Sequence, residues 1–336
     1  MDLSYEPITL RLETPFRIAH GVSETRHNVL VRLTDGPWTG LGEAAPVRQH
    51  HETQADVQAY LAGVSLPGDD PFQLETVLAS LPAGSRAARA ALDIALHDLV
   101  AQRLGVPLYR LWGLDPACAP CTSFTLGIGP VDEVRQRAAE AAEQFPILKL
   151  KLDADEDHSL ALVRAVARAT SARLLVDANC AWTVDQALRL IPRLADLGVE
   201  FVEQPLAEDD LDGLRRLRPA SPLPIFADEP VRAAADIPRL ADCVDGVSIK
   251  VMKAGGLREA LRAIAVARAH GLQVMVSCMV ETSVSITAAA HLSPLADWAD
   301  LDGHLLISND PYTGVGVDRG RLILPQGPGL GVEPRP

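Results

Sequence analysis

The chain has 336 residues and a formal net charge of -13 at pH 7. It is long enough to bury a sizeable core in one large domain or two modest ones. The acidic balance without any basic stretch argues against a nucleic-acid partner, and no apolar run is long enough to span a bilayer. The N-terminus lacks a basic and an apolar signal region, so we expect a cytoplasmic protein with no membrane partner. Cys118 and Cys121 have no second pair at a zinc spacing, so free thiols are expected.

The first part of the chain alternates between apolar and polar residues, as β-strands do. Three strands are predicted at residues 8–12, 29–33 and 39–45. Residues 15–27 lie between the first two and are rich in polar and cationic side chains. We interpret this segment as a hairpin loop or a lid over a site.

Helical spacing follows the three strands. It predicts helices at residues 53–61, 71–81 and 85–104, the last ending at Gly105 with a proline just beyond. The breaker-rich stretch at residues 114–117 predicts a domain boundary. Residues 1–115 are therefore expected to form an α+β domain.

The rest of the chain repeats one unit. Eight apolar runs, each separated from the next by a segment of helical length, end near Thr125, Lys151, Asp177, Glu203, Asp228, Lys250, Ser277 and Asp302. This alternation predicts an α/β fold in which residues 116–303 close as a modified (β/α)7β barrel of the TIM type. The alternative, a doubly wound sheet, would need a glycine-rich phosphate turn that is absent. Residues 304–336 are too rich in proline and glycine for a full helix, and we expect them to return to the first domain.

Lysine is rare in this chain. Only four of the 31 basic residues are lysines, namely Lys149, Lys151, Lys250 and Lys253. A buried lysine can become a neutral amine, whereas arginine stays protonated, so these lysines are candidates for proton transfer. Lys149 and Lys151 alternate in one strand and therefore point to the same face. The alternative is a pair of structural ion pairs, and Lys253 is interpreted as a supporting charge.

Three carboxylates end consecutive predicted strands, namely Asp177, Glu203 and Asp228. The C-terminal strand ends of such barrels carry the chemistry, so these side chains should converge. Their mutual repulsion requires a cation, and an all-oxygen ligand set suits Mg²⁺ or Mn²⁺. The alternative is a set of unrelated ion pairs.

The position of the lysines suggests a reaction. In a ring of eight strands the second and sixth are opposite, so Lys151 and Lys250 should face each other across the axis. If the metal and Lys149 hold a carboxylate, the neighbouring carbon becomes acidic. One lysine can remove its proton and the other can return one from the opposite face, which is racemisation or epimerisation. The accepting lysine must be neutral, a state that nearby cations and desolvation favour.

Asp300 and Asp302 share a face at the end of the eighth strand and can accept hydrogen bonds from a substrate ammonium group. The alternative is a strand-end turn with solvated carboxylates.

These segments together resemble a known family. The matching stretches are residues 90–99, 104–109 and 249–256, with Lys-x-Lys, Asp-Ala-Asn, Glu-Gln-Pro and Asp-Glu at the strand ends. The chain resembles the enolase superfamily and, within it, the muconate-cycloisomerase-like subgroup. The resemblance implies a capping domain over the barrel, one Mg²⁺ per subunit on the three carboxylates with Mn²⁺ as a substitute, and Lys151 and Lys250 as bases.

Within the subgroup, the Asp300-x-Asp302 pair and residues 277–282 resemble the dipeptide epimerases, in which such a pair holds the free amino terminus. Pro230 departs from the serine that is usual in the family. No lid arginine clearly falls where some of these enzymes bind a side-chain carboxylate, and Arg17, His20 and Arg26 are the nearby candidates. The residues expected to contact the substrate are Lys149, Thr125, Asp300, Asp302, Ser277, Met279, His20 and Arg26.

The resemblance implies a Mg²⁺-dependent epimerase acting on the C-terminal residue of a dipeptide such as L-Ala-Glu or a related L-Ala-Xaa. With Ala-Glu as substrate, it would serve peptidoglycan peptide metabolism. The alternatives are an N-acylamino acid racemase, an o-succinylbenzoate synthase or a cycloisomerase, whose substrates give Asp300 and Asp302 no ammonium group to bind. A non-catalytic, metal-stabilised barrel that binds an acidic metabolite is a further alternative. The resemblance is compatible with an acidic or another side chain on the C-terminal residue of the dipeptide, and with a homo-oligomer.

Overall fold

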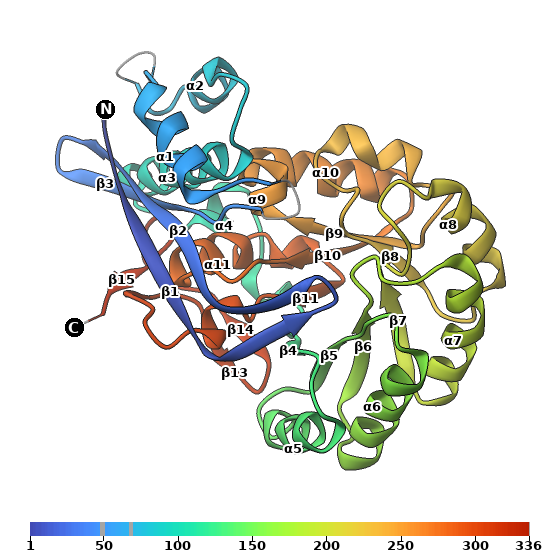
Figure 1. The fold of residues 1–336 in the computed structure, drawn as a ribbon. Helices are drawn as coiled ribbons and strands as arrows, with labels where there is room; N and C mark the ends of the chain where they lie inside the picture. The colour runs from blue at the N-terminus through green and yellow to red at the C-terminus, as the bar shows by residue number, and fades with distance from the viewer. Residues whose placement is uncertain (48–50, 67–69, 336) are drawn as a thin grey trace.

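The computed structural model describes residues 1–47, 51–66 and 70–335. Its N-terminal part, called the cap below, lies beside the barrel and consists of a sheet and the helices that follow it (Figure 1). The sheet is antiparallel and is formed by β1 (Asp2–Ile18), β2 (Gly21–Asp35) and β3 (Trp38–Ala44). Helix α3 (Arg86–Leu104) packs directly on β3. A Cβ atom added at Gly40 or Gly42 would lie 2.0 Å from a carbonyl oxygen of α3, so glycine permits this close approach.

The segment predicted as a hairpin loop is a continuation of the sheet. Strand β1 runs on to Ile18 and β2 begins at Gly21, with pairs such as Phe16 with Ser23 after a register shift that follows Arg11. Phe16 and Ile18 alternate with polar residues, and that alternation is compatible with a strand despite the many charges. The two strands form a hairpin, residues 15–27, that reaches from the cap to the barrel (Figure 1).

The predicted helices of the cap are present. They are α1 (Gln54–Gly63), α2 (Leu74–Ser80) and α3, followed by the short α4 (Leu108–Leu111). The Ser85 side chain caps the first turn of α3, and Gly105 ends the helix with a φ of 69°.

Eight parallel strands follow in chain order. They are β4 (Phe124–Leu126), β5 (Ile147–Lys151), β6 (Arg173–Asp177), β7 (Val199–Glu203), β8 (Ile225–Ala227), β9 (Gly246–Lys250), β10 (Gln273–Ser277) and β11 (Trp298–Asp300). A parallel bridge between Thr122 and Ala299 joins the first strand to the last, and Ser123 N donates to Ala299 O at 2.9 Å. The sheet is therefore a closed barrel, which confirms the predicted fold class.

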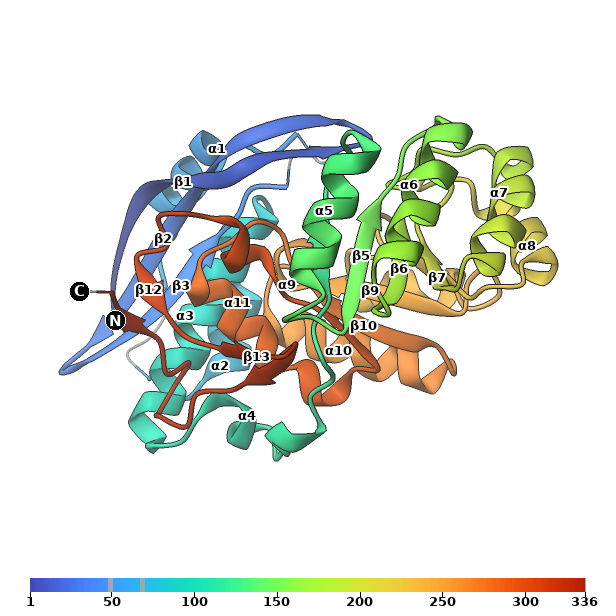
Figure 2. The same ribbon diagram turned by 90° about the horizontal axis from the view of Figure 1, so that it is seen from below.

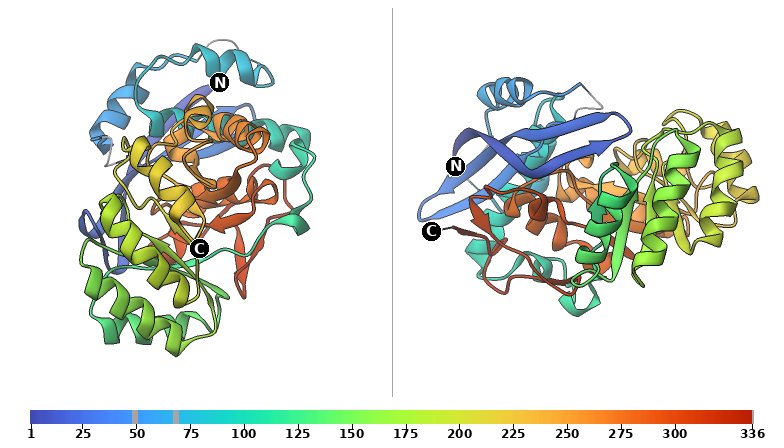
Figure 3. Two further views of the ribbon diagram at one scale, coloured as in Figure 1. Left: turned by 90° about the vertical axis from the view of Figure 1, so that its right-hand side faces the viewer. Right: turned by 60° about the horizontal axis from the view of Figure 1, so that its bottom comes forward.

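Helices lie on the outer side of these strands (Figure 3). They are α5 (Val131–Ala141), α6 (Glu156–Ala169), α7 (Val184–Asp196), α8 (Leu211–Leu217), α10 (Leu257–Ala269) and α11 (Ser283–Ala290). The 3-10 turn η4 (Ala234–Arg239) follows β8, the short α9 (Val251–Ala254) follows β9, and only the 3-10 turn η6 (Gly303–Leu306) follows β11. No helix in the described part of the chain is long and apolar enough to cross a membrane.

The C-terminal tail contacts the cap. Strand β12 (Tyr312–Thr313) pairs with β15 (Glu333–Pro334), β13 (Gly316–Asp318) pairs with β14 (Arg321–Ile323), and both termini lie at the cap end of the molecule (Figure 2). Leu108 N donates to Gly329 O at 2.9 Å, and Leu330 N donates to Asp98 Oδ1 at 2.7 Å. We propose domain limits after residues 115 and 303, with the tail returning to the cap.

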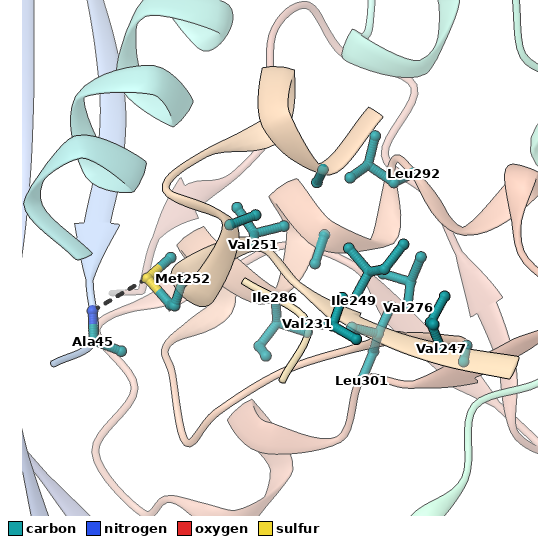
Figure 4. Packing of buried hydrophobic residues seen from close by; sticks show 14 of the residues in the cluster. Ala45, Val231, Val247, Ile249, Val251, Met252, Val276, Ile286, Leu292 and Leu301 are labelled. Atoms are coloured by element: carbon teal, nitrogen blue, oxygen red, sulfur yellow. Dashed lines mark hydrogen bonds between the residues drawn. The ribbon is translucent and has the colours of Figure 1, made fainter. Parts of the chain in front are cut away.

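Two kinds of packing hold the barrel. Outside the strands, Val247, Ile249 and Val276 pack with Ile286 of α11, and Met252 Sδ accepts a hydrogen bond from Ala45 N of the cap at 3.3 Å (Figure 4). Inside the barrel, a separate apolar cluster fills the N-terminal half, formed by Ile147, Leu175, Phe201, Phe226 and Met275. Because side chains two residues apart share a face, the next inward-facing layer consists of the residues that end these strands.

Candidate active site

The inward-facing layer above the apolar cluster is charged. Glu203 follows Phe201 by two residues on β7, and Asp228 follows Phe226 by two, directly after β8. The same relation places Lys149 and Lys151 above Ile147 and Asp177 above Leu175. All of these charged side chains are buried. The alternation along each strand therefore collects bases and acids at the C-terminal mouth of one barrel.

Lys149 lies among three carboxylates and is fully buried. Its Nζ is 2.5 Å from Glu203 Oε2, 2.7 Å from Asp300 Oδ2 and 3.4 Å from Asp177 Oδ2. Burial alone would lower the pKa of Lys149, but the three carboxylates, Asp300 foremost, raise it well above its ordinary value. Lys149 is thus held as an ammonium group and is not a candidate base.

The two other strand-end lysines each contact one acid. Lys151 Nζ lies 2.6 Å from Asp177 Oδ2, and Lys250 Nζ lies 2.8 Å from Asp228 Oδ2. Burial opposes ionisation of both aspartates, yet the lysines lower the pKa of each. In the same way Asp228 raises the pKa of Lys250 against the effect of burial. The nearest neighbour of Lys250 is thus a carboxylate rather than a cation, and this carboxylate favours the ammonium form of the lysine.

Lys253 contacts the same aspartate from the other side. Its Nζ lies 2.5 Å from Asp228 Oδ1 and also donates to the main-chain oxygen of Asp228. This position agrees with the supporting charge expected from the sequence.

Several oxygen atoms at this mouth have no hydrogen-bond donor. Within the described residues, the buried side-chain oxygens without one are both carboxylate oxygens of Glu203, Oδ1 of Asn179 and Oε2 of Glu229. The ion pair of Glu203 with Lys149 does not have the geometry of a hydrogen bond. Burial and neighbouring acids raise the pKa of Glu203 to about 7 and that of Glu229 to about 8. Oxygens without a donor, crowded among acids whose ionisation is opposed by burial, fit a hard divalent cation, which would favour the carboxylate form of these acids.

Each of the three acids predicted to bind a metal contacts a lysine. In the described part of the chain, no three His, Cys, Asp or Glu side chains lie close enough together to hold an ion. The ammonium group of Lys149 lies between Asp177 and Glu203, and Asp228 is held by Lys250 and Lys253. The donor set fits magnesium, and the arrangement of these side chains is that of a charge network with lysines.

Asp300 and Asp302 lie beside this network and are joined by Thr125. Asp300 Oδ1 accepts from Ser123 Oγ at 2.6 Å and from Thr125 Oγ1 at 3.1 Å, while Asp302 Oδ2 accepts from Thr125 N at 2.6 Å. Burial opposes ionisation of Asp300, but Lys149 lowers its pKa to about 2. Burial and the charge of Asp300 raise the pKa of Asp302 to about 7.

A cleft of about 690 Å³ opens over the network, between the hairpin and the strand ends. The predicted site residues that line it are His20, Arg26, Thr125, Lys151, Lys250, Met279, Asp300 and Asp302. Lys149, Asp177, Glu203 and Asp228 are buried beneath it. Ser277, a further predicted substrate contact, does not line this cleft: it is fully buried and its hydroxyl pairs with that of Ser248 at 2.6 Å.

Two cleft residues were assigned no role from the sequence. Asn179 and Glu229 line the cleft and are buried. The signal was present, since each closes a strand-end motif, Asp-Ala-Asn after β6 and Asp-Glu after β8.

Comparison with known proteins agrees with this architecture. Residues 5–113 match the N-terminal domain of the mandelate racemase / muconate lactonizing enzyme family, and residues 133–336 match the enolase C-terminal domain-like family. The L-Ala-D/L-Glu epimerase of Bacteroides thetaiotaomicron is 42% identical over 99% of this chain and 88% of that protein. The hydrophobic dipeptide epimerase of Roseobacter litoralis is 40% identical over 98% of each chain.

A solved structure of a relative has the same fold. The dipeptide epimerase of Enterococcus faecalis V583, complexed with Mg and the dipeptide L-Leu-L-Tyr, superposes with a TM-score of 0.92 at 33% identity over 98% of each chain. The matches to both family models and to full-length relatives show that this chain belongs to the enolase superfamily, in its mandelate racemase / muconate lactonizing enzyme family.

Proposed function

We propose that the protein is a Mg²⁺-dependent dipeptide epimerase that inverts the α-carbon of the C-terminal residue of an L-Ala-Xaa dipeptide. The observation that carries this proposal is the placement of Lys151 and Lys250 at the ends of opposite strands of a closed barrel, with carboxylates between them. The names of the relatives support the substrate class, and the magnesium in the Enterococcus structure supports the cofactor.

The metal would be held by Asp177, Glu203 and Asp228. Their donor set is all oxygen, and both oxygens of Glu203 lack a hydrogen-bond donor among the described residues. When bound, a divalent cation supplies positive charge beside the substrate carboxylate and so acidifies the neighbouring α-carbon. Mn²⁺ is the expected substitute because it accepts the same ligands.

Three lysines have different roles in the proposed reaction. Lys149, held as an ammonium group, binds the substrate carboxylate. Lys151 and Lys250 act on the two faces of the α-carbon. One of them, as a neutral amine, accepts the α-proton, and the other, as an ammonium group, donates a proton to the opposite face. Inversion results because removal and delivery occur on opposite faces.

The cleft selects the substrate. Asp300 and Asp302 accept hydrogen bonds from the free amino terminus of the dipeptide, and Thr125 keeps these two carboxylates together. The hairpin excludes water from the cleft, which His20, Arg26 and Met279 line. Substrates without an ammonium group, such as N-acylamino acids, leave Asp300 and Asp302 without a partner, which disfavours the related racemase, synthase and cycloisomerase reactions.

The proposal is tested with a library of L,L-dipeptides incubated with the protein and Mg²⁺ in heavy water. We expect deuterium at the α-carbon of the C-terminal residue and formation of the L,D epimer, and neither product in the presence of a chelator. Absence of deuterium in every dipeptide would remove the epimerase proposal. Binding of dipeptides or acidic metabolites without exchange would favour a non-catalytic barrel.

A further inference from the structure

Asn179 and Glu229 form a pair of buried acceptors that the proposed reaction does not use. The two residues are 3% and 6% exposed, and both line the cleft. Asn179 Nδ2 lies 3.4 Å from Glu229 Oε1, so each side chain satisfies one atom of the other. Asn179 Oδ1 and Glu229 Oε2 receive no hydrogen bond from any described residue. A buried acceptor in this condition is costly, and the pair therefore calls for a donor from outside the protein.

The backbone fixes both side chains next to the acids of the proposed metal site. Asn179 and Cys180 have φ values of 44° and 65°, a left-handed conformation that is uncommon outside glycine. Asn179 N donates to Asp177 Oδ1 at 2.8 Å, and Cys180 N donates to Gln204 O at 2.9 Å, which hold this turn in place.

The second side chain is fixed through the same glutamine. Asp228 N donates to Gln204 Oε1 at 2.9 Å, so the turn that carries Glu229 is tied to the end of β7. Asn179 Oδ1 and Glu229 Oε2, which receive no hydrogen bond from the described residues, therefore belong to the strand-end turns that carry Asp177 and Asp228.

The missing donor is best supplied by water on the metal. Mg²⁺ keeps several of its water ligands when it binds to protein carboxylates, and the hydrogens of those waters need acceptors. We propose that Glu229 and Asn179 accept hydrogen bonds from magnesium-bound water, and so act as positioning residues for the metal rather than as its ligands. This inference rests on the proposed magnesium site.

The test compares magnesium binding by calorimetry in three metal-free variants and the wild-type protein. Residues that orient a metal's ligands typically contribute 10- to 100-fold to affinity, so we expect Glu229→Gln and Asn179→Ala to weaken Mg²⁺ binding by about that factor. The matched control is Glu208→Gln, because Glu208 lines the same cleft but both its oxygens accept from Arg232 Nη2 at 2.9 Å. The Mg²⁺ affinity of this control variant should stay within about twofold of wild type, since replacing Glu208 removes no acceptor from a metal-bound water.

A second readout separates the positioning role from direct ligation. Proton relaxation of the Mn²⁺-loaded proteins counts the waters on the ion, and this number should be the same in wild type and Glu229→Gln. Unchanged affinity in both variants, or one additional water in Glu229→Gln, would overturn the inference. Melting temperatures of the metal-free proteins verify that each variant is folded. If the wild type itself bound no Mg²⁺, the proposed metal site would fail, an outcome distinct from variants that bind as well as wild type.

Discussion

Lys151 and Lys250 end strands that are four positions apart in a closed ring of eight, and each contacts a different aspartate. Lys151 Nζ is 2.6 Å from Asp177 and Lys250 Nζ is 2.8 Å from Asp228. The two amines therefore approach the barrel axis from opposite sides, with carboxylates between them. This relationship is the basis of the proposed inversion, because a planar intermediate at the axis would have one lysine on each face.

Replacing Lys149 by methionine should destabilise the metal-free protein. The substitution leaves Asp177, Glu203 and Asp300 buried without their shared ammonium group, and breaking a buried ion pair from one side typically costs about 3–5 kcal/mol. Urea denaturation in the presence of a chelator measures the free energy of unfolding. The control is Arg189→Met, which removes an exposed partner of Glu156 and should change little. Equal stability of the two variants would contradict the role of Lys149.

Substrate binding should depend on the ionisation of Asp302. Its pKa is raised to about 7, so the carboxylate is lost as the pH falls through that value, and with it the partner of the substrate ammonium. We expect the KM of an unblocked dipeptide to rise between pH 8 and pH 6. Asp302→Asn should have a high KM at both pH values.

The matched control for this prediction is Asp209→Asn, an exposed acid that lines the same cleft and should keep the wild-type pH dependence. Steady-state kinetics over this pH range make the measurement. A wild-type KM and profile in Asp302→Asn would show that Asp302 does not bind the ammonium group.

Acid should destabilise the fold through His291. Tyr109 N donates to its Nδ1 at 3.3 Å, so Nε2 carries the proton that is donated to Leu330 O at 3.1 Å. Burial lowers the pKa of His291 to about 4, below the ~6.5 of an unfolded chain. The unfolded state consequently binds more protons between these values, and the linked stability falls by about 3 kcal/mol as the pH drops from 7 to 4.

The variant His291→Asn should be less stable at pH 7 but lose less stability on acidification. Exposed His270→Asn is the control and should retain the wild-type slope. Urea denaturation at a series of pH values gives both slopes. If His291→Asn lost as much stability as wild type between pH 7 and pH 4, the histidine would not be the group responsible.

Much of the architecture could be predicted because it depends on local patterns. The two-residue alternation of β5 placed Lys149 and Lys151 on one face, and Gly105 with the proline beyond it correctly predicted the end of α3. The eight strand ends followed from the repeat of apolar runs, since parallel strands with intervening helices recur at nearly constant spacing.

The details that local patterns did not predict depend on contacts between distant parts of the chain. Lys149 donates a hydrogen bond to Asp300, 151 positions away, and no local pattern indicates how close their strands lie. Ser277 is buried because it faces Ser248 of the neighbouring strand. The raised pKa of Lys250 likewise follows from its contact with Asp228 and could not be read from residue types.

The most direct test of the central claim is the reaction of Lys151→Ala and Lys250→Ala with a dipeptide substrate in heavy water. The account predicts that each variant loses epimerisation by about 10²–10⁴-fold, the usual contribution of a positioned general base, while Mg²⁺ binding persists. Turnover at the wild-type rate in both variants would contradict a reaction that passes a proton from one lysine to the substrate and from the substrate to the other.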